Sequence, residues 1–144
     1  MAAYRGVVDE QEARRRFAAS PVARLATVRP DGTPHVVPVT FALAGDVLYT
    51  AVDHKPKRHQ RLQRLTNLRH QPRCALLVDH YQADWSGLWW VRADGDAAIV
   101  DEPDSTHPGL RRLVDRYPTY QNASPEGPLI VVTVVRWTGW DASA

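Results

Sequence analysis

A short cationic segment holds the densest grouping of residues that could carry chemistry in this 144-residue chain. It runs from Asp53 to His59 and contains the only two lysines, Lys55 and Lys57, followed by Arg58. Because it leads from a predicted strand into a predicted helix, its cations and the positive end of the helix could surround one anionic group. A phosphate is the expected ligand, and a solvated charged turn is the alternative interpretation.

The five tryptophans gather in two places. Trp85, Trp89 and Trp90 lie close together in the sequence, and Trp137 and Trp140 lie at the end of a predicted strand. Such indole rings either pack in the core or a dimer interface, or form the walls of a site for a planar ring. Both interpretations stay open at this point.

No familiar catalytic or metal-binding motif is present in the sequence. The chain lacks the nucleophile elbow of hydrolases, the H-E-x-x-H zinc motif, the glycine-rich dinucleotide fingerprint and the phosphate loop. Its six histidines are scattered without the spacing of metal ligands. Its single cysteine, Cys74, begins an apolar run and is expected to be buried and inert. We therefore assign no catalytic side chain and no metal site.

The composition is typical of one soluble globular domain spanning residues 1–144. A net charge of +2, from 18 basic and 16 acidic side chains, favours neither a nucleic acid nor a membrane surface as partner. No apolar run approaches the length of a membrane-spanning helix, and the N-terminus has no signal-peptide core. A cytoplasmic protein is expected.

The first half of the chain predicts one helix followed by strands. The helix covers residues 9–19, with Asp9 as its N-cap and Glu12 completing a capping box. Pro38 cannot donate a hydrogen bond to a neighbouring strand, which places it on an edge strand or at a bulge. Strands joined by tight turns are predicted over residues 22–28, 35–43 and 47–52.

The second half adds two helices and three stretches of strand. Helices are predicted over residues 58–70 and within 103–117, the latter beginning after Asp104 or Ser105. Turn-forming residues 93–95 are expected to interrupt the middle of the three strand stretches, which are 74–79, 88–100 and 129–137. The chain therefore predicts an α+β fold, in which six or seven antiparallel strands close into a barrel with two or three peripheral helices.

The order of these pieces resembles the pyridoxamine 5'-phosphate oxidase-like superfamily of split β-barrel flavin and deazaflavin proteins. The resemblance rests on Leu25-Ala26-Thr27, Asp31-Gly32-x-Pro34, Pro38-Val39, Leu48-Tyr49-Thr50 and the Lys55/Lys57 loop. It extends through Asn67, Pro72-Arg73 and the strand 75–78, and so covers nearly the whole chain. The fold that it implies is an FMN-binding split barrel.

Within that superfamily the chain is most similar to the actinobacterial branch that uses the deazaflavin coenzyme F420. This similarity is carried by Trp89-Trp90-Val91-Arg92-x-Asp94-Gly95 and Arg136-Trp137-Thr138-Gly139-Trp140. Pyridoxamine phosphate oxidases hold the FMN phosphate with an arginine and a lysine on the second strand, and those positions fall on Val37 and Ala42 here. Neither side chain can bind a phosphate, which argues against oxidation of pyridoxamine phosphate.

The resemblance implies an oxidoreductase that transfers a hydride between reduced coenzyme F420 and a small organic substrate. Family members are generally homodimers with two cofactor sites between their subunits. The implied contacts to the ring are Pro38, Val39, Thr40, Tyr49 and Thr50, and those to the phosphate and acidic tail are Lys55, Lys57 and Arg58. Trp89 and Trp140 would contact the ring that is bound by the other subunit.

Two alternatives stay open on the sequence alone. The same fold could hold FMN, or haem through a histidine, and the protein could also be a non-catalytic cofactor carrier. The colour of the purified protein would separate the ligands. Oxidation of the cofactor by an electron-poor test substrate would separate an enzyme from a carrier.

Overall fold

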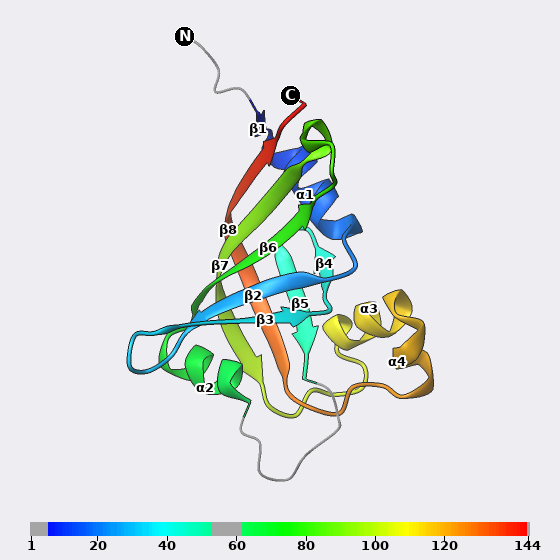
Figure 1. Cartoon of the computed structure of the whole chain (residues 1–144). Coiled ribbons are helices and arrows are strands. Elements are labelled where there is room, and N and C mark those ends of the chain that lie inside the picture. The colour runs from blue at the N-terminus through cyan, green and yellow to red at the C-terminus, as the bar shows by residue number, and fades with distance from the viewer. Residues whose placement is uncertain (1–5, 53–61, 144) are drawn as a thin grey trace.

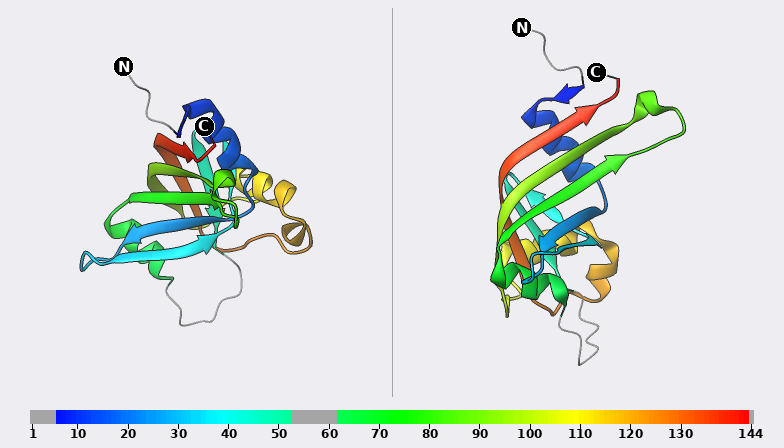
Figure 2. Two further views of the ribbon diagram at one scale, coloured as in Figure 1. Left: turned by 45° about the horizontal axis from the view of Figure 1, so that its top comes forward. Right: turned by 60° about the vertical axis from the view of Figure 1, so that its left-hand side comes forward.

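The computed structural model describes residues 6–52 and 62–143. Within them, eight antiparallel strands form one strongly curved sheet with helices packed around it (Figures 1 and 2). This confirms the α+β split barrel, with eight strands instead of six or seven. The strands are β1 (Val7–Val8), β2 (Ala23–Val28), β3 (Pro34–Val39), β4 (Ala42–Ala44), β5 (Val47–Ala51), β6 (Arg73–His80), β7 (Trp89–Val100) and β8 (Leu129–Asp141). The helices are α1 (Glu10–Ala19), α2 (Gln63–His70), the short 3-10 helix η1 (Trp85–Gly87), α3 (Pro108–Arg116) and α4 (Pro118–Asn122).

Within residues 6–52 and 62–143, the sheet has two open edges. Its strand order is β3-β2-β6-β7-β8-β5-β4, and β1 pairs with the far end of β8. Pro38 lies on the edge strand β3, opposite Arg24 of β2, in agreement with its missing donor. β8 pairs with β1, β7 and β5, and it therefore joins the two halves of the sheet.

The predicted strand 35–43 is two strands in the structure. The chain leaves the sheet at Thr40 and Phe41 and crosses from one open edge, β3, to the other, β4. The final strand is longer than predicted, because it continues beyond Trp137 to Asp141 while pairing with β7.

The turn predicted in the middle of β7 is wrong. The strand is continuous, and its register with β8 shifts between Asp94 and Gly95. Asp94 pairs with Arg136 and Gly95 pairs with Val134, so Val135 is the extra residue of a β-bulge in β8. The turn-forming residues thus accompany a bend of the paired strands instead of ending one of them.

α1 confirms the predicted first helix and its cap. The Asp9 carboxylate accepts the Glu12 N–H at 2.8 Å, while Ala13 and Phe17 bury the inner face. The Glu12 carboxylate bonds to Arg15 in the following turn, so only one half of the capping box is formed around Asp9.

α3 begins later than predicted. Its N-cap is His107, whose Nδ1 accepts the Gly109 N–H at 3.0 Å, whereas Asp104 closes a separate turn with Thr106. α2 covers only residues 63–70 of the helix predicted over 58–70, since its N-cap, Leu62, has an extended backbone. α4 follows α3 directly and was not predicted from the sequence. No helix among the described residues is long and apolar enough to span a membrane.

Two apolar clusters hold these elements together. The larger lies inside the curved sheet beneath α1, whose Phe17 packs against Phe41 and Trp137. The smaller lies between β5 and α3, where Tyr49 packs with buried Leu113. α1 and α2 lie toward opposite ends of the sheet (Figure 1). β7 connects these ends, and its 12 residues span about 36 Å.

Candidate functional site

Lys55, Lys57 and Arg58 lie outside the described residues, so their contact with a phosphate stays a prediction. The described chain stops at Val52, whose N–H donates to Pro128 O at 2.9 Å, and resumes with the first turn of α2. The side chains of that first turn therefore follow the cationic segment directly in the sequence.

α2 begins with an arginine that the sequence analysis did not single out. Arg64 is partly buried, and its Nε is shielded from water without a hydrogen-bond partner among the described residues. Burial lowers the pKa of this guanidinium, and the nearby Tyr120 phenol opposes that effect. Leu62, the N-cap residue, gives the first N–H groups of α2 no side-chain acceptor. An arginine that has lost water without gaining an acceptor is suited to bind an anion.

A line of hydrogen bonds connects the same helix to β2. Gln63 Nε2 donates to Asn67 Oδ1 at 2.7 Å, and Asn67 Nδ2 donates to Thr27 Oγ1 at 2.9 Å. Asn67 and Thr27 are both buried, so these bonds fix α2 against the sheet. His35 pairs with Thr27 across β2 and β3, and its buried Nδ1 also lacks a partner in the described part of the chain.

Thr40, one of the predicted ring contacts, lies where the chain leaves β3. Its Oγ1 is 3.0 Å from the Tyr120 hydroxyl of α4. The Tyr120 phenol also acts electrostatically on Arg64, which links a predicted site residue to two groups that the sequence analysis missed. This Thr40–Tyr120–Arg64 cluster combines a hydrogen-bonded pair of hydroxyls with a guanidinium within electrostatic range, and it is the candidate functional site.

The other predicted ring contacts point in different directions. Pro38 is exposed, whereas Val39 is buried in the larger apolar cluster. Tyr49 packs edge-on against His107 beneath α3, with the ring centroids 6.1 Å apart. Thr50 is buried on the opposite face of β5 from Tyr49, since neighbouring residues of a strand alternate. The side chains of Tyr49 and Thr50 therefore cannot both face one ligand.

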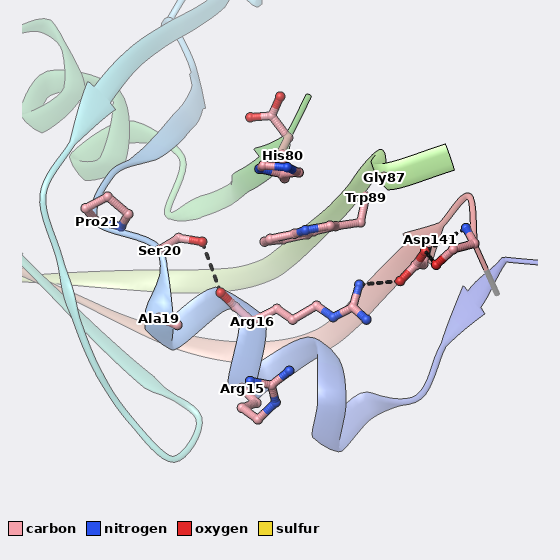
Figure 3. Close-up of a pocket in the computed structure, with 11 residues that line it drawn as sticks. Arg15, Arg16, Ala19, Ser20, Pro21, His80, Gly87, Trp89 and Asp141 are labelled. Atoms are coloured by element: carbon pink, nitrogen blue, oxygen red, sulfur yellow. Dashed lines mark hydrogen bonds and ion pairs between the residues drawn. The ribbon is translucent and has the colours of Figure 1, made fainter. Parts of the chain in front are cut away.

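Trp89 lines a cavity of about 550 Å³ between α1 and the ends of β6, β7 and β8 (Figure 3). Its indole lies between the near-parallel His80 ring, 6.2 Å away, and the Arg16 guanidinium, 5.4 Å from the indole centroid. Arg16 donates to Asp141 at 2.6 Å, so the charges of this pair neutralise each other. Within one chain, both faces of the Trp89 indole are therefore covered.

Trp140 lies on the opposite face of the sheet from Trp89. It pairs with Trp90 across β7 and β8, whereas Trp89 pairs with Asp141. Trp89 is the first residue of β7 and Trp140 lies beside it on β8, at the end of the sheet remote from α2. A single chain does not bring them to Arg64, and their role across a subunit interface stays a prediction.

Other reactive side chains are kept out of the site by burial. Cys74 is buried as predicted, and burial raises the pKa of its thiol to about 12, so the thiolate is scarce at neutral pH. Among the described residues, no three His, Cys, Asp or Glu side chains gather as a metal site would require. Val37 and Ala42 pack against the apolar clusters and offer nothing to a phosphate.

A comparison with protein-family models identifies the family of the chain. The model of the pyridoxamine 5'-phosphate oxidase family matches residues 9–141, which include every described strand except β1. The chain belongs to this family. Its members include oxidoreductases.

Several solved structures share this fold along most of the chain. A conserved hypothetical protein of Mycobacterium tuberculosis is 24% identical with a TM-score of 0.77, over 99% of this chain and 90% of its own. An F420 reductase is 27% identical with a TM-score of 0.60, over 85% and 94%. A FAD-binding protein of Mesorhizobium loti is 20% identical with a TM-score of 0.69, over 92% and 94%. Among curated proteins, no significant match is found.

Proposed function

We propose that the chain is an F420-dependent oxidoreductase that transfers a hydride between the deazaflavin and a small organic substrate. The similarity to an F420 reductase supports this choice of cofactor, because it reaches 27% identity over 94% of that protein. The FAD-binding protein is 20% identical and is evidence for the fold alone. FMN remains the competing ligand that the experiment must exclude.

The observation that carries the proposal is the buried Nε of Arg64, which has no hydrogen-bond partner in residues 6–52 and 62–143. A phosphate oxygen at this atom would supply the missing acceptor and restore the favourable environment that burial has removed. The planar guanidinium presents several donors in a geometry that suits phosphate. Lys55, Lys57 and Arg58 precede Arg64 closely in the sequence and would add charge around the same group.

The task of the protein is then to align the two carbons, one of the deazaflavin and one of the substrate, between which the hydride passes. The ring, when bound, supplies the hydride donor or acceptor. The outer backbone edge of β3, at Pro38 and Val39, has no sheet partner in the described residues and is free to meet a planar ligand. The hydroxyls of Thr40 and Tyr120 can hydrogen-bond to polar ring atoms. Such alignment can supply much of the rate enhancement without a protein acid or base.

Titration with oxidised F420 and, separately, with FMN tests the proposal, with ligand fluorescence as the readout. We expect Arg64→Gln to raise the dissociation constant for F420 about 10- to 100-fold, the loss of one or two charge-assisted hydrogen bonds. Arg69→Gln is the matched control on the same helix, because Arg69 is exposed and already paired with Asp101. Its dissociation constant should stay within about twofold of the unmodified protein.

Three results would contradict parts of this proposal. Equal effects of the two arginine variants would remove Arg64 from the site. Tighter binding of FMN than of F420 would place the chain among the flavin binders. Reduced F420 that is never oxidised, across a panel of electron-poor test substrates, would indicate a carrier instead of an enzyme.

We also propose that two chains form a homodimer with the cofactor between them. The outer face of β2, β3 and β6 carries apolar side chains at the surface, among them Val36 (59% exposed) and Leu77 (38%). Ala26 of β2 pairs with both Val36 and Ala75, so the apolar surface is continuous across the three strands. A second copy covering this face would explain why a monomer exposes it.

A further inference from the structure

At the chain crossing between β3 and β4, the peptide groups of Phe41 have no strand partner among the described residues. The Tyr117 hydroxyl accepts the Phe41 N–H at 3.0 Å. Its single proton can be donated either to Phe41 O, 2.8 Å away, or to Pro21 O, 2.9 Å away. Burial raises the pKa of Tyr117, so the hydroxyl keeps its proton at neutral pH.

Arg116, the preceding residue, fastens the same crossing. Its guanidinium donates to Phe41 O at 2.6 Å and to Ser20 O, and it lies 4.7 Å from the centroid of the Phe41 ring. The end of α3 is therefore bonded to the α1–β2 connection and to the β3–β4 crossing at once. Phe41 itself is fully buried against Phe17, which leaves its backbone little freedom.

Fixing Phe41 also fixes the residue before it. Thr40 meets Tyr120 through its Oγ1, and the Tyr120 ring packs edge-on against Tyr117 at 5.7 Å. We infer that Tyr117 is a positioning residue of the candidate site, which aims Thr40 and Tyr120 at the cofactor ring without touching the ring. The inference rests on the proposed function, and it adds a group remote from the ligand that governs ring binding.

The substitution Tyr117→Phe removes one hydroxyl and keeps the ring. Three quantities are measured: amide hydrogen exchange at residues 40–41, the dissociation constant for F420, and the fluorescence emission of the bound coenzyme. We expect faster exchange at these amides, an affinity loss of about 5- to 10-fold, and an altered emission maximum, since the acceptor of the Phe41 N–H is lost and Thr40 moves. Arg116→Gln repeats the test if Tyr117→Phe folds poorly.

The control is Asp9→Ala, which removes the cap of α1 and lowers stability without touching the crossing. It should leave both the affinity and the emission of bound F420 unchanged. Faster exchange in Tyr117→Phe with unaltered affinity and emission would make Tyr117 a purely structural residue and overturn the inference. Unchanged exchange would overturn it as well. If the unmodified protein binds neither F420 nor FMN, the proposed function fails first and the inference fails with it.

Discussion

The carboxylate of Asp141 connects α1 to the last strand. Its Oδ2 accepts from Arg16 at 2.6 Å, and its Oδ1 accepts from the Ser143 hydroxyl and N–H at 2.6 and 2.8 Å. The Ser143 hydroxyl, together with the Arg16 guanidinium, lowers the pKa of this carboxyl from 3.8 to about 2. A carboxyl whose pKa is lower in the folded state stabilises the fold above its ordinary pKa. That contribution disappears as the pH falls from about 4 to about 2.

The variant Asp141→Asn should therefore lose stability only where the carboxylate is charged. We expect the free energy of unfolding to fall by about 1–2 kcal/mol at pH 7 and to match the unmodified protein near pH 2. Urea unfolding at both pH values measures the difference. Asp84→Asn is the matched control, because Asp84 accepts hydrogen bonds from the N–H and the hydroxyl of Ser86, as Asp141 does from Ser143. An equal deficit for Asp141→Asn at both pH values would show that packing, not charge, is lost.

Two arginines of α2, which the sequence does not distinguish, differ in how deeply the structure buries them. Arg69 is exposed and bonded to Asp101, whereas Arg64 is partly buried and its Nε has no partner in the part of the chain that the structure describes. The family resemblance included Asn67 on the same helix but not Arg64, and the structure shows Asn67 to be buried. Arg64 was missed because α2 packs on β2 and β7, which lie before and after it in the chain, and the sequence alone does not show which of its arginines that packing buries.

The bulge opposite Gly95 brings two backbones into close contact. A Cβ atom at this glycine would lie 2.5 Å from the carbonyl oxygen of Thr133, and a backbone atom in a paired strand cannot move aside. Gly45, in the β4–β5 turn, has a φ of 61° and open space around the corresponding position. The two glycines are therefore required for different reasons: one for space and the other for its backbone angle.

We expect Gly95→Val to lower the free energy of unfolding by about 3 kcal/mol or to prevent folding. Gly45→Asn should cost less than about 1 kcal/mol, because asparagine tolerates the left-handed region. Thermal and urea unfolding of both variants provide the comparison. A mild effect at Gly95 would mean that the β7 and β8 backbones can separate at the bulge.

Elements defined by local signals were predicted well, and elements defined by distant partners were not. The cap at Asp9 and the turn around Gly32 act through neighbours in the sequence, so the first helix and hairpin were found. Residues 93–95 have the same turn-forming character, but strands on both sides hold them in a continuous β7. The crossing at Thr40 was likewise hidden, because Tyr117 and Arg116 contact it from a helix much later in the chain.

At the scale of the whole molecule, the apolar outer face of the sheet sets the expected assembly. Sedimentation and light scattering should give twice the 16.2 kDa of one chain. Val36→Asp should yield monomers and weaken F420 binding at least tenfold, because a charge would be buried between subunits. Val7→Asp is the control, since Val7 is 60% exposed on β1, outside that face. A monomeric Val36→Asp variant with undiminished F420 affinity would show that each chain holds a complete site.

The position of β8 in the sequence has a consequence for folding during synthesis. Of the eight strands described, β8 is synthesised last, yet within this set it alone connects the β4–β5 hairpin to the rest of the sheet and covers one edge of β7. Until residues 129–141 have left the ribosome, the apolar β7 edge and the inner face of the hairpin have no partner. Unpaired edges of this kind are where nascent chains associate with one another. The nascent protein therefore has its greatest need of chaperones just before its last strand emerges.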